Sequence, residues 1–219
     1  MTIFARMRKC LTLFALWLLA ACADRGLQDG DLIFQANDSS GFTDAIENVT
    51  EGAWSHVGIV RKYRGGTYVL EATTREGVVR TRLEDFLDGS AHDSAGRPLV
   101  QVRRLDDPDA ASIGRRAVRK AESYLGRPYD FAFASGMDAV YCSELVWTCF
   151  RREDGSPVFS AIPMTFKGPD GETDPYWVAY YDRLGTPIPE GEPGTNPNDL
   201  AKEPLLREVL ITFPAKTVQ

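Results

Sequence analysis

Three residues of types that cooperate in nucleophilic catalysis are Cys142, His56 and Glu71. A cysteine thiol becomes a strong nucleophile when an imidazole takes its proton, and a carboxylate can orient that imidazole. The chain has only two histidines, so the choice of base is narrow. His92 lies in a polar loop, where accurate positioning is difficult, whereas His56 lies in a predicted strand. If Cys142 is a nucleophile, His56 is therefore the candidate base and Glu71 is the candidate that orients it. The alternative for a lone strand histidine such as His56 is a structural role.

Residues 141–150, YCSELVWTCF, predict a helix that carries Cys142 in its first turn. Its apolar residues recur at the spacing of one buried helix face. A helix start carries partial positive charge and unpaired N–H groups, which favour a thiolate and are the expected donors to an oxyanion. The alternative is that Cys142 is simply the first small residue of the buried face. We interpret Cys149 in that way. The face consists of Cys142, Leu145, Val146, Cys149 and Phe150.

Two predicted strands, residues 53–60 and 68–72, form a hairpin through the turn residues 64–67. If the turn centres near Arg64, the numbers of facing residues sum to about 129, and Glu71 faces Gly58. Glu71 and His56 then share one face of the sheet, and Gly58 leaves room between them. A slip of one residue would place them on opposite faces. The alternative is that Glu71 points to solvent.

The remaining pattern predicts an α+β domain, an antiparallel sheet packed against helices. Residues 168–204 are rich in Pro, Gly and Asp, and we expect long surface loops there with one helical turn. That stretch includes an aromatic cluster at Tyr176, Trp177, Tyr180 and Tyr181. Asp107 and Pro108 are expected to cap and start a helix that runs to about residue 125. Further strands are expected within 30–35, 78–79, 98–105 and 209–213, and a helix within 42–49 behind Ser39 and Ser40.

Five short motifs occur in a characteristic order, and together they resemble one family. The resemblance is to the circularly permuted branch of the NlpC/P60 papain-like hydrolases, the YaeF/YiiX group, and it runs from about Gly30 to Phe150. It implies a circularly permuted papain-like (NlpC/P60) fold, with His56 as the base, Glu71 as the third residue and Cys142 as the nucleophile. In members without the permutation, the cysteine precedes the histidine. The motifs are GDL at 30–32, SHVGIV at 55–60, LEA at 70–72, GRPYD at 126–130 and YCSEL at 141–145.

The resemblance implies a cysteine hydrolase that cleaves an amide bond through a thioester, without a cofactor or metal. A cell-wall stem peptide or a related envelope amide is the expected substrate. One alternative is a lipid acyltransferase or phospholipase that uses the same thioester. Lecithin:retinol-acyltransferase-like proteins share the permuted order, but their cysteine motif is Asn-Cys-Glu-His, against Tyr-Cys-Ser-Glu at 141–144 here. Another alternative is a binding module without activity. Tyr129 either lines the cleft or packs in the core.

The N-terminus carries the features of a secretory signal: Arg6, Arg8 and Lys9, followed by an uncharged apolar run at 11–21. That run is too short to span a bilayer comfortably. Leu-Ala-Ala-Cys at 19–22 resembles the lipobox of bacterial lipoproteins, which implies cleavage before Cys22 and lipid on its sulfur and amino group. An ordinary signal peptide cut nearby, or an uncleaved anchor, is the alternative.

On the lipoprotein reading the chain divides into a signal peptide at 1–21, a tether at 22–29 and the hydrolase domain at 30–219, with a loop-rich C-terminal part. Ala23 after the lipobox, rather than Asp, favours the outer membrane, with the protein facing the periplasm.

The chain is acidic, with a formal net charge of −6. Removal of the signal leaves 22 basic and 31 acidic residues, a net charge of −9. Such a surface does not favour nucleic acid or anionic lipid, so we expect the N-terminal lipid to hold the protein at the membrane. Cys142 and Cys149 lie two helical turns apart, too far to form a disulfide within the helix, and no CxxC pair suggests a metal site. The expected partners are a peptide or amide substrate and the membrane.

Overall fold

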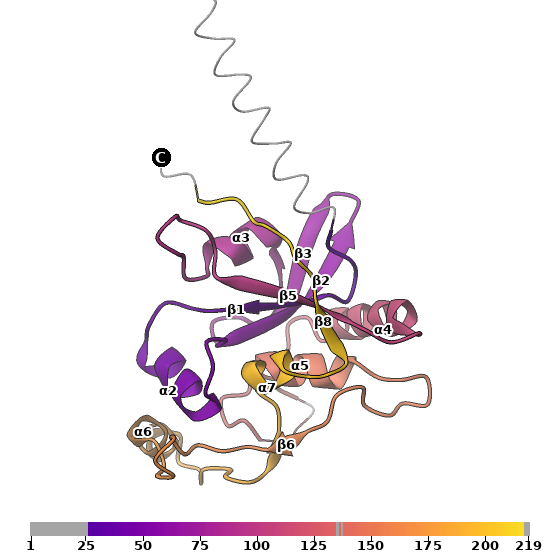
Figure 1. The fold of residues 1–219 in the computed structure, drawn as a ribbon. Coiled ribbons are helices and arrows are strands. Elements are labelled where there is room, and N and C mark those ends of the chain that lie inside the picture. Colours follow the sequence, from indigo (N-terminus) through magenta and orange to yellow (C-terminus); the bar gives the residue numbers. More distant parts are fainter. Residues whose placement is uncertain (1–25, 135, 137, 217–219) are drawn as a thin grey trace, which may run out of the picture.

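A six-stranded antiparallel sheet forms the centre of the computed structural model, of which residues 26–134, 136 and 138–216 are described. Its strand order is β4-β3-β2-β1-β5-β8 (Figure 1). The α+β architecture predicted from the sequence is thereby confirmed. The strands are β1 (Leu32–Gln35), β2 (His56–Tyr63), β3 (Gly66–Thr73), β4 (Gly77–Arg82), β5 (Val100–Leu105) and β8 (Leu206–Glu208), and a separate pair is β6 (Ile162–Pro163) with β7 (Pro193–Gly194).

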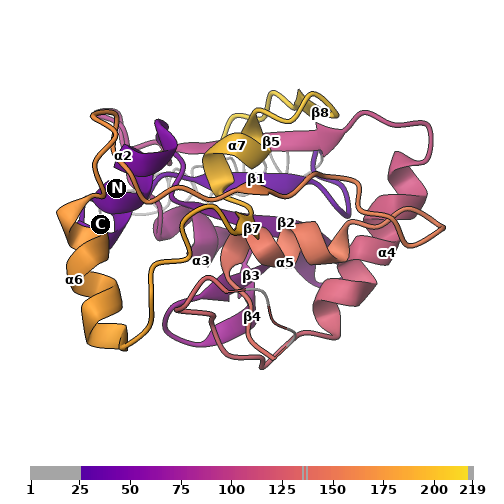
Figure 2. The same ribbon diagram turned by 90° about the horizontal axis from the view of Figure 1, so that it is seen from below.

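Helices cover both faces of this sheet. α4 and α5 lie on one face, α3 lies on the other, and α2 and α6 pack against each other beyond the end of the sheet (Figures 1 and 2). None of the helices in the described part of the chain is long and apolar enough to cross a bilayer. The helices are α2 (Gly41–Thr50), α3 (Leu83–Asp88), α4 (Ala110–Glu122), α5 (Cys142–Cys149), α6 (Pro175–Leu184) and α7 (Pro197–Ala201).

The alternation of side chains along the central strands explains why both faces are apolar. In β1, Leu32 and Phe34 join the core under α4 and α5, whereas Ile33 joins the cluster on the α3 side. In β2, Ile59 and Val60 divide between the two clusters in the same way. Successive residues of a strand point to opposite faces, so a strand buried on both sides reads as a continuous apolar run. The short apolar run after Asp31 is therefore a central strand.

The hairpin formed by β2 and β3 has the predicted register. Ile59 pairs with Leu70 and Val60 with Val69, so the numbers of facing residues sum to 129. This register places Gly58 opposite Glu71 and puts Glu71 on the same sheet face as His56. The prediction that depended on the turn centre is confirmed.

Two predicted helices differ in outcome at their N-termini. α2 begins as expected, because the Ser40 hydroxyl accepts a hydrogen bond from the Thr43 N–H at 3.1 Å. For α4, the prediction that Asp107 caps the helix is wrong, because the N-cap is Asp109 and the helix begins at Ala110. The Asp107 carboxylate instead accepts hydrogen bonds from the Asp109 N–H and from the Arg152 side chain.

The C-terminal part contains more regular structure than predicted. The expected loops at 168–204 include two helices, α6 and α7, and the aromatic residues Trp177 and Tyr181 of α6 are only 2 % exposed. They pack with Ala45 and Val49 of α2 and with Phe166, and we call these five residues the α2–α6 cluster. The closing strand is β8 at 206–208 rather than 209–213. The segment after β8 continues along the sheet without pairing as a strand in the described residues.

Candidate active site

Cys142 is the first residue of α5, as predicted, and its side chain is buried with 6 % exposure. The preceding residue, Tyr141, is extended, and its N–H donates to the Glu144 carboxyl group at 3.3 Å. The other predicted residues of the helix face, Leu145 to Phe150, lie in the main core. Two backbone bonds, Val140 N–H to Pro128 and Asp130 N–H to Val140, tie the start of α5 to the GRPYD segment. This segment therefore fixes the position of the thiol.

His56 is the first residue of β2 and lies opposite Gln35 of β1. Its Nε2 lies 2.5 Å from Glu71 Oε2, and its side chain is 12 % exposed. Phe86 of α3 lies beside the imidazole, with 5.9 Å between the ring centroids. These contacts hold the ring in one orientation, which leaves Nδ1 as the nitrogen that can serve Cys142.

Glu71 is 5 % exposed and does not point to solvent. Its second carboxylate oxygen accepts a hydrogen bond from the Thr81 hydroxyl of β4. Gly58 provides the space for the pair, because a Cβ built on it would lie 2.2 Å from Val69 Cγ1 and 3.4 Å from the Glu71 Cβ. Both oxygens of the buried carboxylate therefore have partners, which a buried charge requires.

The charge state of His56 follows from these neighbours. Burial alone would lower the pKa of the imidazole, but hydrogen bonds to Cys142 and Glu71, together with their negative charges, raise it to about 10. His56 is thus protonated at neutral pH. The structure brings together all three residues predicted from the sequence, and their catalytic roles remain a prediction.

The other residues considered from the sequence have simpler surroundings. His92 forms an isolated β-bridge with Pro98 in the loop before β5 and lines neither cavity at the site. Burial raises the pKa of the Cys149 thiol to about 12, which fits a residue of the core. Tyr129 fulfils both alternatives, since it is buried and also lines the site. Cys22 lies outside the described residues.

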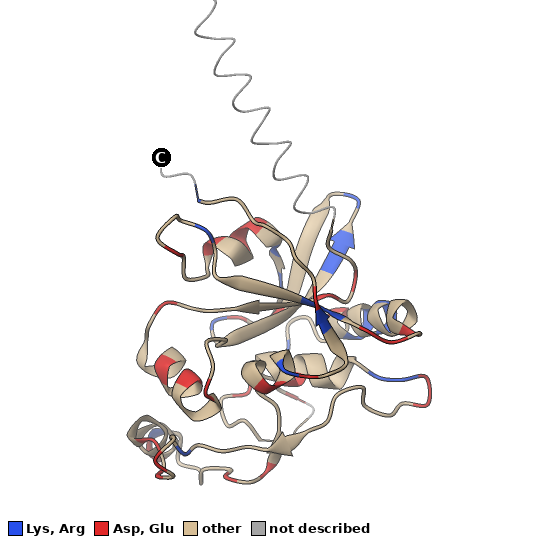
Figure 3. Ribbon diagram, in the orientation of Figure 1, with Lys and Arg blue, Asp and Glu red and all other residues tan. Residues whose placement is uncertain are grey.

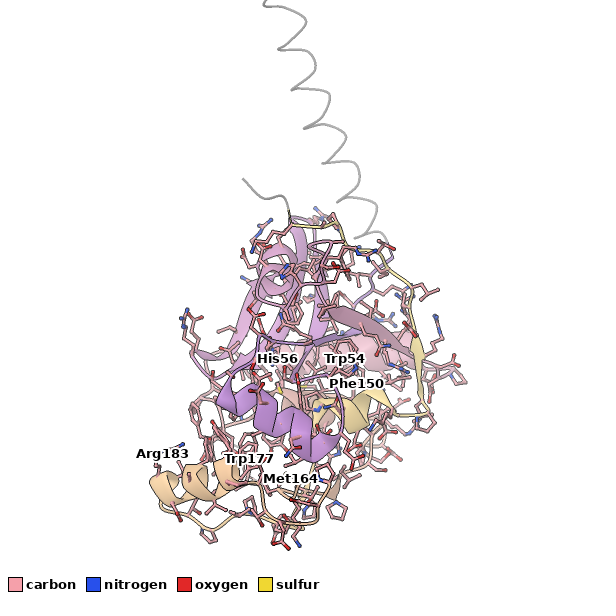
Figure 4. The ribbon with its side chains drawn as sticks, turned by 60° about the vertical axis from the view of Figure 1, so that its left-hand side comes forward. Trp54, His56, Phe150, Met164, Trp177 and Arg183 are labelled. Atoms are coloured by element: carbon pink, nitrogen blue, oxygen red, sulfur yellow. The ribbon has the colours of Figure 1, made fainter. Side chains whose placement is uncertain are left out.

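Two cavities adjoin the three residues. A smaller one of about 70 Å³ is lined by Cys142, and a larger one of about 530 Å³ is lined by His56 and Glu71. In Figure 4 His56 lies where the sheet meets α2, whereas Trp177 and Met164, which belong to the wall of the smaller cavity, lie on the α6 side of that helix. The side chains common to both cavities are Ile46, Ser55 and Tyr129.

Several of these residues could not be identified from sequence patterns. Val79 of β4 pairs with Glu71, and Thr81 lies on the same face of β4 two residues further on. Only the register of β3 and β4 could therefore have indicated that Thr81 contacts Glu71. Phe86, Met164 and Trp177 reach the site through tertiary packing and have no local pattern that indicates it.

The chain also matches a known protein family over most of its length. Residues 26–210 match the model of the C92 family, described as permuted papain-like amidase enzymes of the YaeF/YiiX type. The match includes the C-terminal part that lay beyond the motifs. The uncharacterized protein YiiX of Escherichia coli K12 is 31 % identical over 188 residues, which cover 85 % of this chain and 88 % of that one.

A solved structure has the same fold. The crystal structure of metalloprotein yiiX from Escherichia coli O157:H7 is 29 % identical to this chain, with a TM-score of 0.68 over 85 % of this chain and 98 % of that one. The description as a metalloprotein applies to the E. coli protein. Among the residues described here, no three His, Cys, Asp or Glu side chains are grouped so that they could hold a metal ion. The fold, the ordered motifs and these matches lead to one conclusion: the chain belongs to the YaeF/YiiX, C92 family of permuted papain-like amidases.

Proposed function

We propose that this protein is a lipid-anchored cysteine amidase in which Cys142 attacks the carbonyl carbon of an amide. The observation that carries the proposal is the contact of His56 with Glu71 on one side and Cys142 on the other. A protonated imidazole is the partner that stabilises a thiolate nucleophile, and a buried carboxylate stabilises that imidazole. In the proposed reaction, Cys142 attacks as a thiolate beside the protonated His56.

The first half of the reaction forms a thioester. The Cys142 sulfur bonds to the carbonyl carbon, and the oxygen takes the negative charge. When the carbon–nitrogen bond breaks, His56 gives its proton to the leaving amine. Backbone N–H groups in the first turn of α5 have no partners within the helix, and we assign the Cys142 N–H as a donor to the oxyanion. A structure of a tetrahedral adduct with its oxygen turned away from that N–H would contradict this assignment.

The second half of the reaction needs His56 as a base. Two of the causes that raise its pKa are the hydrogen bond to Cys142 and the Cys142 charge. Formation of the thioester removes both of these and therefore lowers the pKa of His56. The neutral ring can then take a proton from the water that attacks the thioester, and the acid leaves as the carbon–sulfur bond breaks.

The central test compares Cys142→Ala with Cys149→Ala, two cysteines of the same helix. We expect Cys142→Ala to abolish both hydrolysis of muropeptides and labelling by iodoacetamide, followed by intact mass, while its circular dichroism spectrum stays unchanged. Cys149→Ala, which removes a buried sulfur outside the site, should retain both if it folds. Full activity in Cys142→Ala would refute the proposal. Failure of every thiol reagent to modify Cys142 in the wild type would also refute it and would favour a binding module.

The cellular part of the proposal rests on the sequence of the N-terminus. A lipid on Cys22 would hold the enzyme at the outer membrane on the periplasmic side, near cell-wall peptides and other envelope amides. This location, together with the family, supports a stem peptide or related amide as the substrate class.

The apolar lining of the cavity beside Cys142 favours a second candidate, a lipid acyltransferase or phospholipase that uses the same thioester. The two candidates predict different products. Incubation with phospholipid vesicles and, separately, with muropeptides should release lysophospholipid only if the second candidate is correct, and a cleaved peptide only if the first is.

A further inference from the structure

The two cavities are lined by different members of the proposed catalytic pair, Cys142 and His56. The smaller cavity is lined by Cys142 and not by His56, and the larger one is lined by His56 and not by Cys142. They meet at shared side chains, among them Tyr129. A substrate bound across the site would therefore place one part in each cavity, with the scissile bond between them.

The reaction decides which part lies where. The acyl carbon becomes bonded to the Cys142 sulfur, so the acyl group must lie on the Cys142 side. The leaving nitrogen takes a proton from His56, so the amine must lie on the His56 side. The orientation follows from the proposed function and depends on it.

The smaller cavity is compact and apolar. At about 70 Å³ it holds a short group rather than a long chain, and its walls come from α2, α6 and the segment at Met164. Burial of methylene groups against such walls is favourable, at roughly 0.8 kcal/mol for each group. Its apolar lining includes Ile46, Val49, Phe133, Met164, Phe166 and Trp177.

The larger cavity combines hydroxyl and amide side chains with aromatic rings, and the only charged groups among its described lining residues are the paired His56 and Glu71. Apart from His56 and Glu71, which pair with each other, no Asp or Glu lines it, and no described Lys or Arg lines either cavity. Figure 3 shows Lys and Arg mainly at the end of β2, on α4 and where β5 and β8 cross. Hydroxyl and amide groups beside aromatic rings suit a neutral, hydroxyl-bearing group that can stack and form hydrogen bonds. The lining includes Asn37, Ser40, Thr73, Thr74, Tyr176 and Tyr180.

We infer that the substrate is an N-acyl amide with a short apolar acyl group in the Cys142 cavity and an uncharged, hydroxyl-bearing amine, such as an amino sugar, in the His56 cavity. A substrate with a carboxylate or phosphate on the amine side would find no Lys or Arg of the described chain in that cavity, where the one cation, His56, is already paired with Glu71. Among the envelope amides proposed above, the inference therefore selects an N-acyl amino sugar over a stem peptide with free carboxylates. A long fatty acyl chain would exceed the smaller cavity, so the size of that cavity argues against the lipid acyltransferase or phospholipase that its apolar lining alone would favour.

The two half-reactions allow each cavity to be tested separately. In the first, p-nitrophenyl acetate, butyrate or octanoate acylates the enzyme: the carbon–sulfur bond forms, the carbon–oxygen bond breaks and nitrophenolate leaves. In the second, an added amine attacks the thioester: the carbon–nitrogen bond forms, the carbon–sulfur bond breaks, and the amine proton passes to His56. The amines are glucosamine and glucosamine 6-phosphate, which differ only by the phosphate.

For the wild type, we expect butyrate to acylate Cys142 about ten-fold faster than acetate, in accord with two additional buried methylene groups, and octanoate to be no better than butyrate. We expect the butyryl enzyme to transfer to glucosamine at least ten-fold faster than to glucosamine 6-phosphate. A preference for octanoate, or for the phosphorylated amine, would overturn the inference.

Two exposed threonines at the rims give a pair of matched variants. Thr165→Trp narrows the smaller cavity and should abolish the preference for butyrate over acetate. Thr74→Arg adds a cation to the larger cavity and should raise transfer to glucosamine 6-phosphate relative to glucosamine by about ten-fold. Thr212→Trp, an exposed position that lines neither cavity, controls for the substitution itself.

The outcomes separate the inference from the proposed function. If no ester forms a thioester on wild-type Cys142, the proposed function fails and the inference fails with it. If the thioester forms but Thr74→Arg changes the acyl preference and Thr165→Trp changes the amine preference, the orientation is the reverse of the one inferred. If neither variant changes either ratio, the cavities do not hold the substrate, and the amidase proposal stands without them.

Discussion

The proton on His56 connects the three residues of the site. Glu71 and Cys142 are both negatively charged partners of the imidazole, and each contributes to a pKa of about 10. In the proposed mechanism, His56 is an acid before the amine leaves and a base afterwards. The loss of the thiolate on acylation provides the change between these two roles.

Glu71→Gln tests this account through the pH dependence of activity. In the wild type, kcat/KM should fall on the alkaline side near pH 10, because the imidazolium that protonates the amine is lost. The glutamine keeps a polar group but not the charge, so the pKa of His56 falls and the alkaline limb moves to lower pH. We also expect kcat to fall by about 100-fold. Glu76→Gln, at an exposed position in the turn between β3 and β4, is the control. An unchanged alkaline limb would contradict the role of Glu71.

Glu144 makes a second prediction at the scale of one residue. Burial raises its pKa to about 8 from the ordinary 4.5, so the folded state binds this proton more tightly than the unfolded state. Stability is then lost as the pH rises from about 4.5 through about 8. Glu144→Gln removes the titration and keeps an oxygen for the Tyr141 N–H.

We expect the free energy of unfolding of the wild type to fall by up to about 4 kcal/mol more than that of Glu144→Gln between roughly pH 5 and pH 9. Urea titrations at the two pH values measure the difference. Parallel pH dependence of the two proteins would show that Glu144 does not carry a raised pKa.

At the scale of elements, the hairpin positions the base and its partner. A Cβ at Gly58 would lie 2.2 Å from Val69 Cγ1, and Val69 is fully buried and cannot move away. Gly58→Ala should therefore lower the free energy of unfolding by about 1–3 kcal/mol. It should also lower kcat, because the new methyl group approaches Glu71. Gly65→Ala, in the turn of the same hairpin with no neighbour within 4 Å, is the matched control. Equal stabilities of the two variants in urea would contradict the steric argument.

The elements that carry Cys142, His56 and Glu71 were those the sequence predicted best. The helix at Cys142 has a clear apolar period, and the hairpin has a turn and a register constrained by the buried faces. The C-terminal helices were missed because their Pro, Gly and Asp content suggested loops. Asp174 and Pro175 do form the start signal of α6, and Gly185 ends it. The same Asp-Pro pair at 107–108 gave a wrong prediction of the N-cap of α4. The Asp107 carboxylate accepts hydrogen bonds from Arg152 and the Asp109 N–H, and the N-cap is Asp109.

The cavities could not be predicted because they depend on packing between distant segments. The smaller one exists only where α2, α6, the start of α5 and the segment at 193–197 meet. No local pattern in any one of these segments indicates the others. The sequence therefore predicted that Cys142, His56 and Glu71 lie together but not the shape of the cavities beside them.

At the scale of the whole molecule, the C-terminal part completes the site. The α2–α6 cluster packs away from the sheet and adjoins the smaller cavity, so residues after α5 form part of the wall beside Cys142. The family match through residue 210 agrees with this role. The sheet carries His56 and Glu71, and the helices beyond its end contribute walls of the two cavities.

The manner of attachment to the envelope is also a property of the whole molecule. A net charge of −9 after removal of residues 1–21 opposes binding to an anionic lipid surface, so the proposed attachment depends on the lipid at Cys22. Cys22→Ala should move the protein from the membrane fraction to the soluble fraction and abolish incorporation of an alkyne-labelled fatty acid, while hydrolysis per molecule is unchanged. Cys10→Ala, within the proposed signal, should keep both attachment and label. Washing with about 1 M salt should not release the wild type, because screening weakens ionic contacts and leaves buried acyl chains in place. Cys22→Ala protein that stays in the membrane fraction after such a wash would indicate an uncleaved anchor instead.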